Sequence, residues 1–270
     1  MKAVPPFHSA RTSCPITVAM MRLLPVVMLL VTVISTPVSA LNIPEKLVFS
    51  LTWTGIKAGT ATQEIIDEKD SIRVVSTARS ADWISVFFPV EDRVESILTK
   101  VTPPLFGLPR NYRIKTREGN RRKDKEIIFD HDRRKALYID HLGKGKVEVA
   151  IKENTYDIYS SFCYVRTLPL EVGKSVYVSI LDNNELWNVE VQVLKKEKLD
   201  TILGEVNTIL IKPLIKSEGI FERKGEIFIW LTDDARRIPV KMKTKVRIGS
   251  VTATLVDANF RNSDPAGAIK

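Results

Sequence analysis

The chain has little cysteine and little histidine, which narrows its chemistry. Two cysteines and three histidines occur in 270 residues. Cys14 lies in an N-terminal segment that we expect to be removed, so Cys163 would remain without an internal disulfide partner. The neighbours of Cys163 are apolar, which favours a small core residue over a reactive thiolate. Stability must therefore come from packing.

Sequence strings that mark common catalytic and metal sites are missing too. The chain has no His-Glu-x-x-His, no paired Cys-x-x-Cys and no Gly-x-Ser-x-Gly. His131 lies between Asp130 and Asp132, a pattern compatible with a cation site, but Arg133 and Arg134 add positive charge beside it. An exposed hairpin loop explains this pattern better. We expect no metal ion, no cofactor and no enzymatic activity.

The N-terminal segment has the layout of an export signal. Arg22 precedes an apolar run of 12 residues, Leu23–Ile34, and small residues end at Ala40. This order is typical of a secretory signal peptide. Because a helix needs about 20 apolar residues to cross a bilayer, we expect residues 1–40 to be removed, leaving no transmembrane segment in the mature chain.

The mature chain is moderately basic. The formal charge of +9 falls to +6 without the leader, which contains Lys2, Arg11 and Arg22 and no acid. An exported protein of this charge meets anionic phospholipids, lipopolysaccharide phosphates and acidic glycans. The charge therefore gives no reason to expect nucleic acid as a partner, and it is compatible with peripheral membrane contact.

Apolar and polar residues alternate from residue 46 onward, which is the period of a half-buried strand. In the first run Leu47, Phe49, Leu51 and Trp53 share one face, and a turn begins at Gly55. Further strands are predicted at residues 60–67, 71–79, 92–99, 110–117, 121–130, 135–140, 145–151, 174–181, 185–198, 203–213, 225–232, 238–247 and 249–258.

Short connectors join many of these strands and make neighbouring strands antiparallel, because parallel strands need longer crossovers. We predict a mainly β fold, with a curved antiparallel sheet that forms an open or partial barrel; a two-sheet sandwich is the alternative. Residues 41–261 form a single domain, or two lobes that meet near residues 152–157. Residues 262–270 form a flexible tail.

Two segments depart from the strand pattern. Ala81–Phe88 concentrates large apolar side chains before Pro89, which predicts a helical turn that plugs the sheet. Asp157–Leu168 has apolar residues at helical spacing, and Asp157 is placed to cap the first turn.

The aromatic residues of the first segment have two interpretations. Trp83, Phe87 and Phe88 fill the core by default, because facing sheet surfaces need large side chains between them. Alternatively they line or cover an apolar cavity that holds an acyl chain.

A basic ribbon is predicted where residues 110–117 pair with residues 121–130. Arg113, Lys115 and Arg117 share one face, and the other face carries Tyr112, Ile114 and Thr116. The cations are suited to anionic head groups through charge-assisted hydrogen bonds. Basic ribbons also serve simply to discourage edge pairing.

Carboxylates offer a weaker catalytic pattern. Asp233 and Asp234 are adjacent in a predicted hairpin, where capping of backbone amides is the expected role. Asp157, Arg166, Asp234 and Arg237 are candidates for buried pairs that join helix and sheet.

Four segments are informative together: residues 219–240 (GIFERKGEIFIWLTDDARRIPV), residues 55–59 (GIKAG), residues 157–161 (DIYSS) with 164–166 (YVR), and residues 248–251 (IGSV). They resemble the exported bacterial family called domain of unknown function 3108, over about residues 45–258. The resemblance implies a Gram-negative envelope location, hence the periplasm, and a β-rich fold. It supplies no activity. A looser similarity, through Trp230 and Ile238-Pro239-Val240, is to periplasmic lipoprotein carriers, and function does not follow from such an analogy.

We therefore expect a periplasmic protein that binds an envelope lipid, glycolipid or anionic glycan. Trp83, Phe87 and Phe88 are the candidates for an apolar pocket, and the candidates for head groups are Arg113, Lys115 and Arg117. One alternative is an envelope assembly or scaffolding protein that binds other proteins through sheet edges. Another is a hydrolase that acts on cell-wall sugars.

Overall fold

The computed structural model describes residues 41, 43–101, 107–214, 226–245 and 249–260. Contacts between Cα atoms divide the chain into two units, residues 1–36 and residues 37–270, and all described residues belong to the second. The predicted signal peptide and the predicted tail at 262–270 lie outside the described residues. Among the residues described, no helix has the length and apolar character that crossing a bilayer requires.

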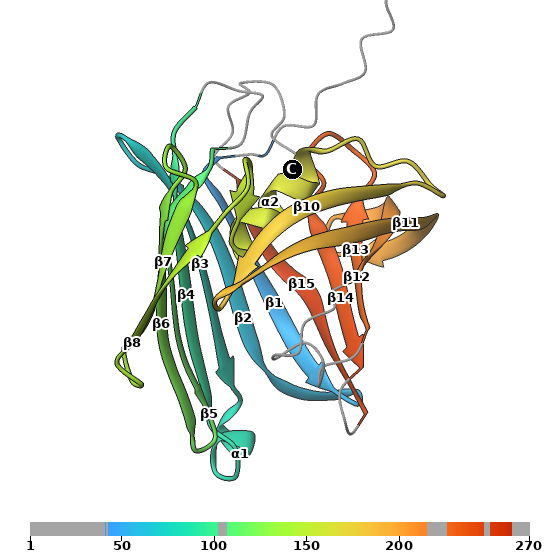
Figure 1. The fold of residues 1–270 in the computed structure, drawn as a ribbon. Helices are drawn as coiled ribbons and strands as arrows, with labels where there is room; N and C mark the ends of the chain where they lie inside the picture. The colour runs from blue at the N-terminus through green and yellow to red at the C-terminus, as the bar shows by residue number, and fades with distance from the viewer. Residues whose placement is uncertain (1–40, 42, 102–106, 215–225, 246–248, 261–270) are drawn as a thin grey trace, which may run out of the picture. The chain divides into compact units, whose positions relative to one another are not determined.

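The described chain forms one sheet of 15 strands and two helices (Figure 1). The strands are β1 (Glu45–Trp53), β2 (Ile56–Asp67), β3 (Ser71–Ser80), β4 (Val90–Thr99), β5 (Pro109–Glu118), β6 (Arg121–Asp130), β7 (Lys135–Asp140), β8 (Gly145–Ala150), β9 (Thr155–Tyr156), β10 (Ser175–Asp182), β11 (Glu185–Thr201), β12 (Gly204–Leu214), β13 (Ile227–Thr232), β14 (Pro239–Lys245) and β15 (Ser250–Phe260). The helices are α1 (Asp82–Ser85) and α2 (Ile158–Thr167).

Neighbouring strands of the sheet are consecutive in the chain, except at the middle, where the first and last strands meet. Its order is β8-β7-β6-β5-β4-β3-β2-β1-β15-β14-β13-β12-β11-β10-β9, so β1 pairs with β15. Every neighbouring pair is antiparallel except β9 and β10, which are parallel. The predicted curved antiparallel sheet is confirmed, as one sheet that does not close and not as a two-sheet sandwich.

Each predicted strand overlaps an observed one, and the alternation gives the sheet its inner face. In β1, Leu47 and Phe49 are buried and belong to the core, as the pattern predicts. Residues 151–154 connect β8 to β9, a strand of two residues that the sequence analysis does not predict. The end of β10 packs on the inner side of β5–β7, because Leu181 lies in one cluster with Tyr112, Ile127 and Tyr138.

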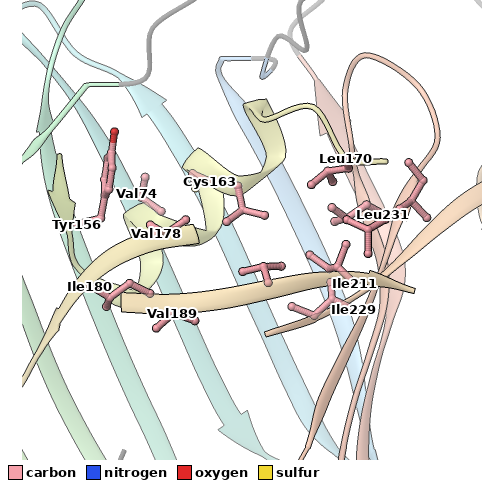
Figure 2. Close-up of a cluster of buried hydrophobic side chains, with 14 of the residues drawn as sticks. Val74, Tyr156, Cys163, Leu170, Val178, Ile180, Val189, Ile211, Ile229 and Leu231 are labelled. Carbon is pink, nitrogen blue, oxygen red and sulfur yellow. The ribbon is translucent and has the colours of Figure 1, made fainter. Parts of the chain in front are cut away.

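Helix α2 packs inside the curve of the sheet, at one end of the strands (Figure 1). Its Cys163 belongs to the largest apolar cluster, together with Val74 of β3 and Ile211 of β12 (Figure 2). The helix begins where predicted: the Asp157 carboxylate accepts hydrogen bonds from the backbone N–H groups of Tyr159 and Ser160, both at 2.9 Å. This capping box fixes the first turn.

A buried ion pair fixes the last turn of α2. The partner of Arg166 in this pair is Glu45, which is not among the residues expected to form buried pairs. The Arg166 guanidinium donates to both carboxylate oxygens of Glu45, at 2.7 Å each. It also donates to the backbone oxygens of Arg236 and Arg237. The predicted partners among Asp157 and Asp234 are occupied elsewhere, because Asp157 caps α2 and Asp234 binds within its own turn.

Candidate functional site

A cavity of about 470 Å³ lies between α2 and the inner face of the sheet. Its walls are mainly apolar and come from both arms of the sheet. The apolar lining consists of Phe49, Leu51, Ala61, Ala78, Val94, Ile114, Ile127, Ile158, Phe162, Val165, Val178, Ile180, Trp187, Val189, Val191, Ile211, Pro213, Ile227, Ile229, Met242 and Ala253.

The strand register explains where the space comes from. On β1, β2 and β3, Phe49, Ala61 and Ala78 are direct cross-strand neighbours and all line the cavity. Two alanines side by side leave room above the sheet that larger side chains would fill. Helix α2 closes this space on one side with Ile158 and Phe162. The cavity is therefore set by small residues on the floor and a fixed helix above them.

One side of the cavity is polar. We call it the polar corner; it consists of Thr116, Glu118, Lys123, Lys125, Asp182 and Asn183. The ammonium group of Lys125 donates to Oδ1 of Asn183 at 2.7 Å and lies 5.5 Å from the ring centroid of Tyr138. Burial raises the pKa of the Asp182 carboxyl, and the charge of Lys125 acts in the opposite direction. The carboxylates of Glu118 and Asp182, and of Asp92 directly across from Thr116, lie among these ammonium groups, so the corner offers both hydrogen-bond donors and acceptors to a polar group.

The predicted basic ribbon lies on the other face of β5. Tyr112, Ile114 and Thr116 line the cavity, so the alternation of the strand places Arg113, Lys115 and Arg117 on the outer face. Arg113 is paired with Asp124 at 2.9 Å and with Glu126 at 3.3 Å. These cations are thus separated from the cavity by the sheet.

The predicted aromatic residues lie at and just after α1. Trp83, Phe87 and Phe88 are all exposed and are not among the residues that line the cavity. The expectation that they fill the core is wrong, because the β3–β4 connection projects beyond the end of the sheet (Figure 1). Neither predicted group lines the cavity, although Arg117 at the end of β5 lies near the β3–β4 connection that carries Phe88.

The family described as "Protein of unknown function (DUF3108)" matches residues 48–256. The chain belongs to this family. No curated protein matches. Among solved structures, the chain is similar to the beta-barrel-like protein of domain of unknown function DUF1849 from Brucella abortus, with 11% identity, a TM-score of 0.54, and coverage of 83% of this chain and 100% of that one. At this identity the likeness shows the fold alone.

In this DUF3108 chain the site residues that sequence reasoning missed are Lys123 and Lys125. A signal for them exists, because every second residue of a strand lies on the same face, and Lys123 and Lys125 alternate in step with Ile127 and Phe129 further along β6. Ile127 and Phe129 are buried, so this alternation would have placed both lysines on the inner face.

The remaining candidates serve the fold. His131 Nε2 lies 2.8 Å from the backbone oxygen of Pro109, and His141 Nε2 lies 2.8 Å from Glu126. Asp233 binds Lys196 at 2.6 Å and Arg237 at 3.0 Å. Within the described ranges, no group of three or more His, Cys, Asp or Glu side chains is placed to hold a metal ion.

Proposed function

We propose that the protein binds the acyl chain of an envelope lipid or glycolipid in the cavity under α2, without transforming it. The observation that carries this proposal is the cavity itself: about 470 Å³ of mainly apolar space within a curved sheet. Ligand pockets of proteins commonly measure ~300–1,000 Å³. An acyl chain suits such walls, because each methylene group removed from water contributes about 0.8 kcal/mol.

The polar corner supports a ligand with a polar head group. Lys123 and Lys125 lie on the inner face at the side of the cavity, beside Asn183. An acyl chain among Ala61, Ala78 and Phe162 would leave its head group within this corner, where both donors and acceptors are available. The proposed ligand is therefore amphiphilic, with a polar head group.

The proposed compartment is the periplasm. This part of the proposal rests on the leader at residues 1–40, whose layout is that of an export signal. A periplasmic carrier would shield an acyl chain from water between two membranes.

Scaffolding through a sheet edge is less well supported. The free side of β8 is one edge of the sheet, and this strand is largely exposed. However, β8 carries Lys146 and Glu148, and Glu148 is paired with Lys135 at 2.6 Å. Charged residues on an edge strand discourage addition of another strand.

The test is lipid extraction from protein purified without detergent, combined with native mass spectrometry. We expect a species heavier than the polypeptide, which releases an acyl lipid in organic solvent. A fluorescent fatty acid should compete with it. Protein of the bare polypeptide mass that also fails to take up the probe would contradict the proposal.

Cavity-filling variants make this test specific. Ala61→Phe places a ring in the cavity floor, and Ala78→Leu is a smaller change for the case in which the first variant unfolds. Thr60→Phe is the matched control, because Thr60 is the exposed neighbour on the same strand. Lipid content should fall in the two cavity variants, with thermal unfolding measured in parallel, and remain in the control.

A further inference from the structure

The β1–β2 turn and the β3–β4 connection lie at the end of the sheet opposite α2 (Figure 1). Both carry exposed apolar side chains, which we call the aromatic rim. Its members and exposed fractions are Phe87 (85%), Val86 (77%), Ile56 (59%), Phe88 (52%), Trp83 (48%) and Trp53 (40%). Among the described residues, every exposed Trp or Phe belongs to it.

The aromatic rim is held in place by hydrogen bonds. Trp83 Nε1 donates to the backbone oxygen of Lys57 at 3.0 Å, which ties α1 to the neighbouring turn. The backbone N–H of Gly119 donates to the oxygen of Pro89 at 2.8 Å, which ties the same connection to the β5–β6 turn. These hydrogen bonds hold the connection in a conformation in which the side chains of Val86 and Phe87 are exposed. Clustered apolar side chains of this kind mark an interaction surface.

Three arginines flank the aromatic rim at the β5–β6 turn: Arg117, Arg121 and Arg122, here called the rim arginines. All three are exposed, and none forms an ion pair with a described residue. Arg117 lies directly across from Arg122 of β6 and from Glu91 of β4, and Arg121 lies across from Glu118, so acidic neighbours offset part of the like-charge repulsion. The exposed guanidinium groups are available to an anionic partner.

We propose that the aromatic rim docks on the surface of a lipid bilayer with anionic head groups. Phe87, Val86 and Phe88 enter the interface, where aromatic side chains are favoured, and the rim arginines contact phosphate groups. The lining of the cavity reaches Thr116 and Lys123 at this same end of the sheet. Docking does not depend on a ligand in the cavity, so it goes beyond the function proposed above.

The first test is sedimentation with vesicles of phosphatidylcholine containing phosphatidylglycerol. Binding should weaken on the order of tenfold in Phe87→Ser, since one exposed ring is lost. It should weaken by a similar factor or more in Arg121→Glu/Arg122→Glu, and it should decrease with salt. Tyr177→Ser is the control, because Tyr177 is 59% exposed on β10 and should leave binding unchanged.

A second measurement locates the contact. Phe87→Cys and Tyr177→Cys, each labelled with an environment-sensitive dye, should differ: only the dye at position 87 shifts to the blue on addition of vesicles. Absence of vesicle binding at low salt, or equal response of both dyes, would overturn the proposal. So would self-association that Phe87→Ser abolishes while vesicle binding persists, because the occupant would then be a second copy of the chain.

Discussion

Glu45 at the start of β1 and Arg166 in the last turn of α2 form a bidentate ion pair from which solvent is excluded, with both side chains 0% exposed. The pair joins positions 121 residues apart and anchors the helix that closes the cavity. A buried ion pair of this kind contributes little more to stability than apolar side chains of similar volume would. Loss of one partner, however, leaves the other charge buried without compensation.

Glu45→Gln is therefore expected to lower the free energy of unfolding by about 3–5 kcal/mol, as measured by urea unfolding. The double variant Glu45→Leu/Arg166→Met should recover most of this loss. Lys46→Gln is the control, because the adjacent Lys46–Glu64 pair is solvent-exposed and should contribute little. Equal effects at positions 45 and 46 would show that the buried pair has no special role.

Cys163 provides a probe of α2. Its side chain is fully buried beside Gln63, and burial raises the pKa of the thiol to about 12. We expect no reaction of the native protein with a thiol reagent at about pH 8, where a free cysteine is partly ionised, and full reaction in denaturant. Glu45→Gln should speed labelling under native conditions. Rapid labelling of the native wild-type protein would mean that α2 is not closed over the core.

The sequence predicts the strands well, because one buried face imposes a period of two on Leu47 and Phe49 as on Ile127 and Phe129. The cap at Asp157 is equally local. Pairing of β1 with β15 is not predictable in this way, because it joins strands about 200 residues apart and leaves no local signal.

The candidate site is harder to predict than the fold. Trp83 and Phe87 read as core residues, because a run of aromatic side chains looks the same in sequence whether it turns inward or projects beyond the sheet. The partner of Arg166 depends on where α2 docks, which no spacing encodes.

The Asp157 carboxyl should leave a signature in the pH dependence of stability. Burial raises its pKa above the ordinary 3.8, although hydrogen bonds from Ser96 and Ser160 act the other way. The folded state therefore keeps the proton to higher pH than the unfolded state, so this contribution to stability is complete below the unfolded pKa and is lost as pH rises through the folded pKa.

Asp157→Asn keeps a capping side chain and removes the titration. Urea unfolding between about pH 4 and pH 7 should show the wild type losing stability relative to this variant as the pH rises. A difference between the two proteins that stays constant over this range would contradict the assignment.

Two glycines with positive φ allow the effect of backbone strain to be distinguished from the effect of moving a side chain of the aromatic rim. Gly119 has φ +61° and Gly204 has φ +88°, so an alanine is strained at both positions, by about 1–2 kcal/mol. A Cβ at Gly119 would lie 2.8 Å from Cε2 of Phe88, whereas a Cβ at Gly204 would have no atom within 4 Å. Because Phe88 is exposed, its ring can turn away without disturbing the core.

Gly119→Ala and Gly204→Ala should consequently lose similar amounts of stability in urea unfolding, but only Gly119→Ala should bind anionic vesicles more weakly. The difference follows from position: a Cβ at Gly119 in the β5–β6 turn would meet the ring of Phe88, whereas a Cβ at Gly204, the first residue of β12, would meet no residue of the aromatic rim. If both variants bind vesicles as the wild type does while Phe87→Ser does not, the orientation of Phe88 is irrelevant and the membrane contact is confined to the tip of the β3–β4 connection.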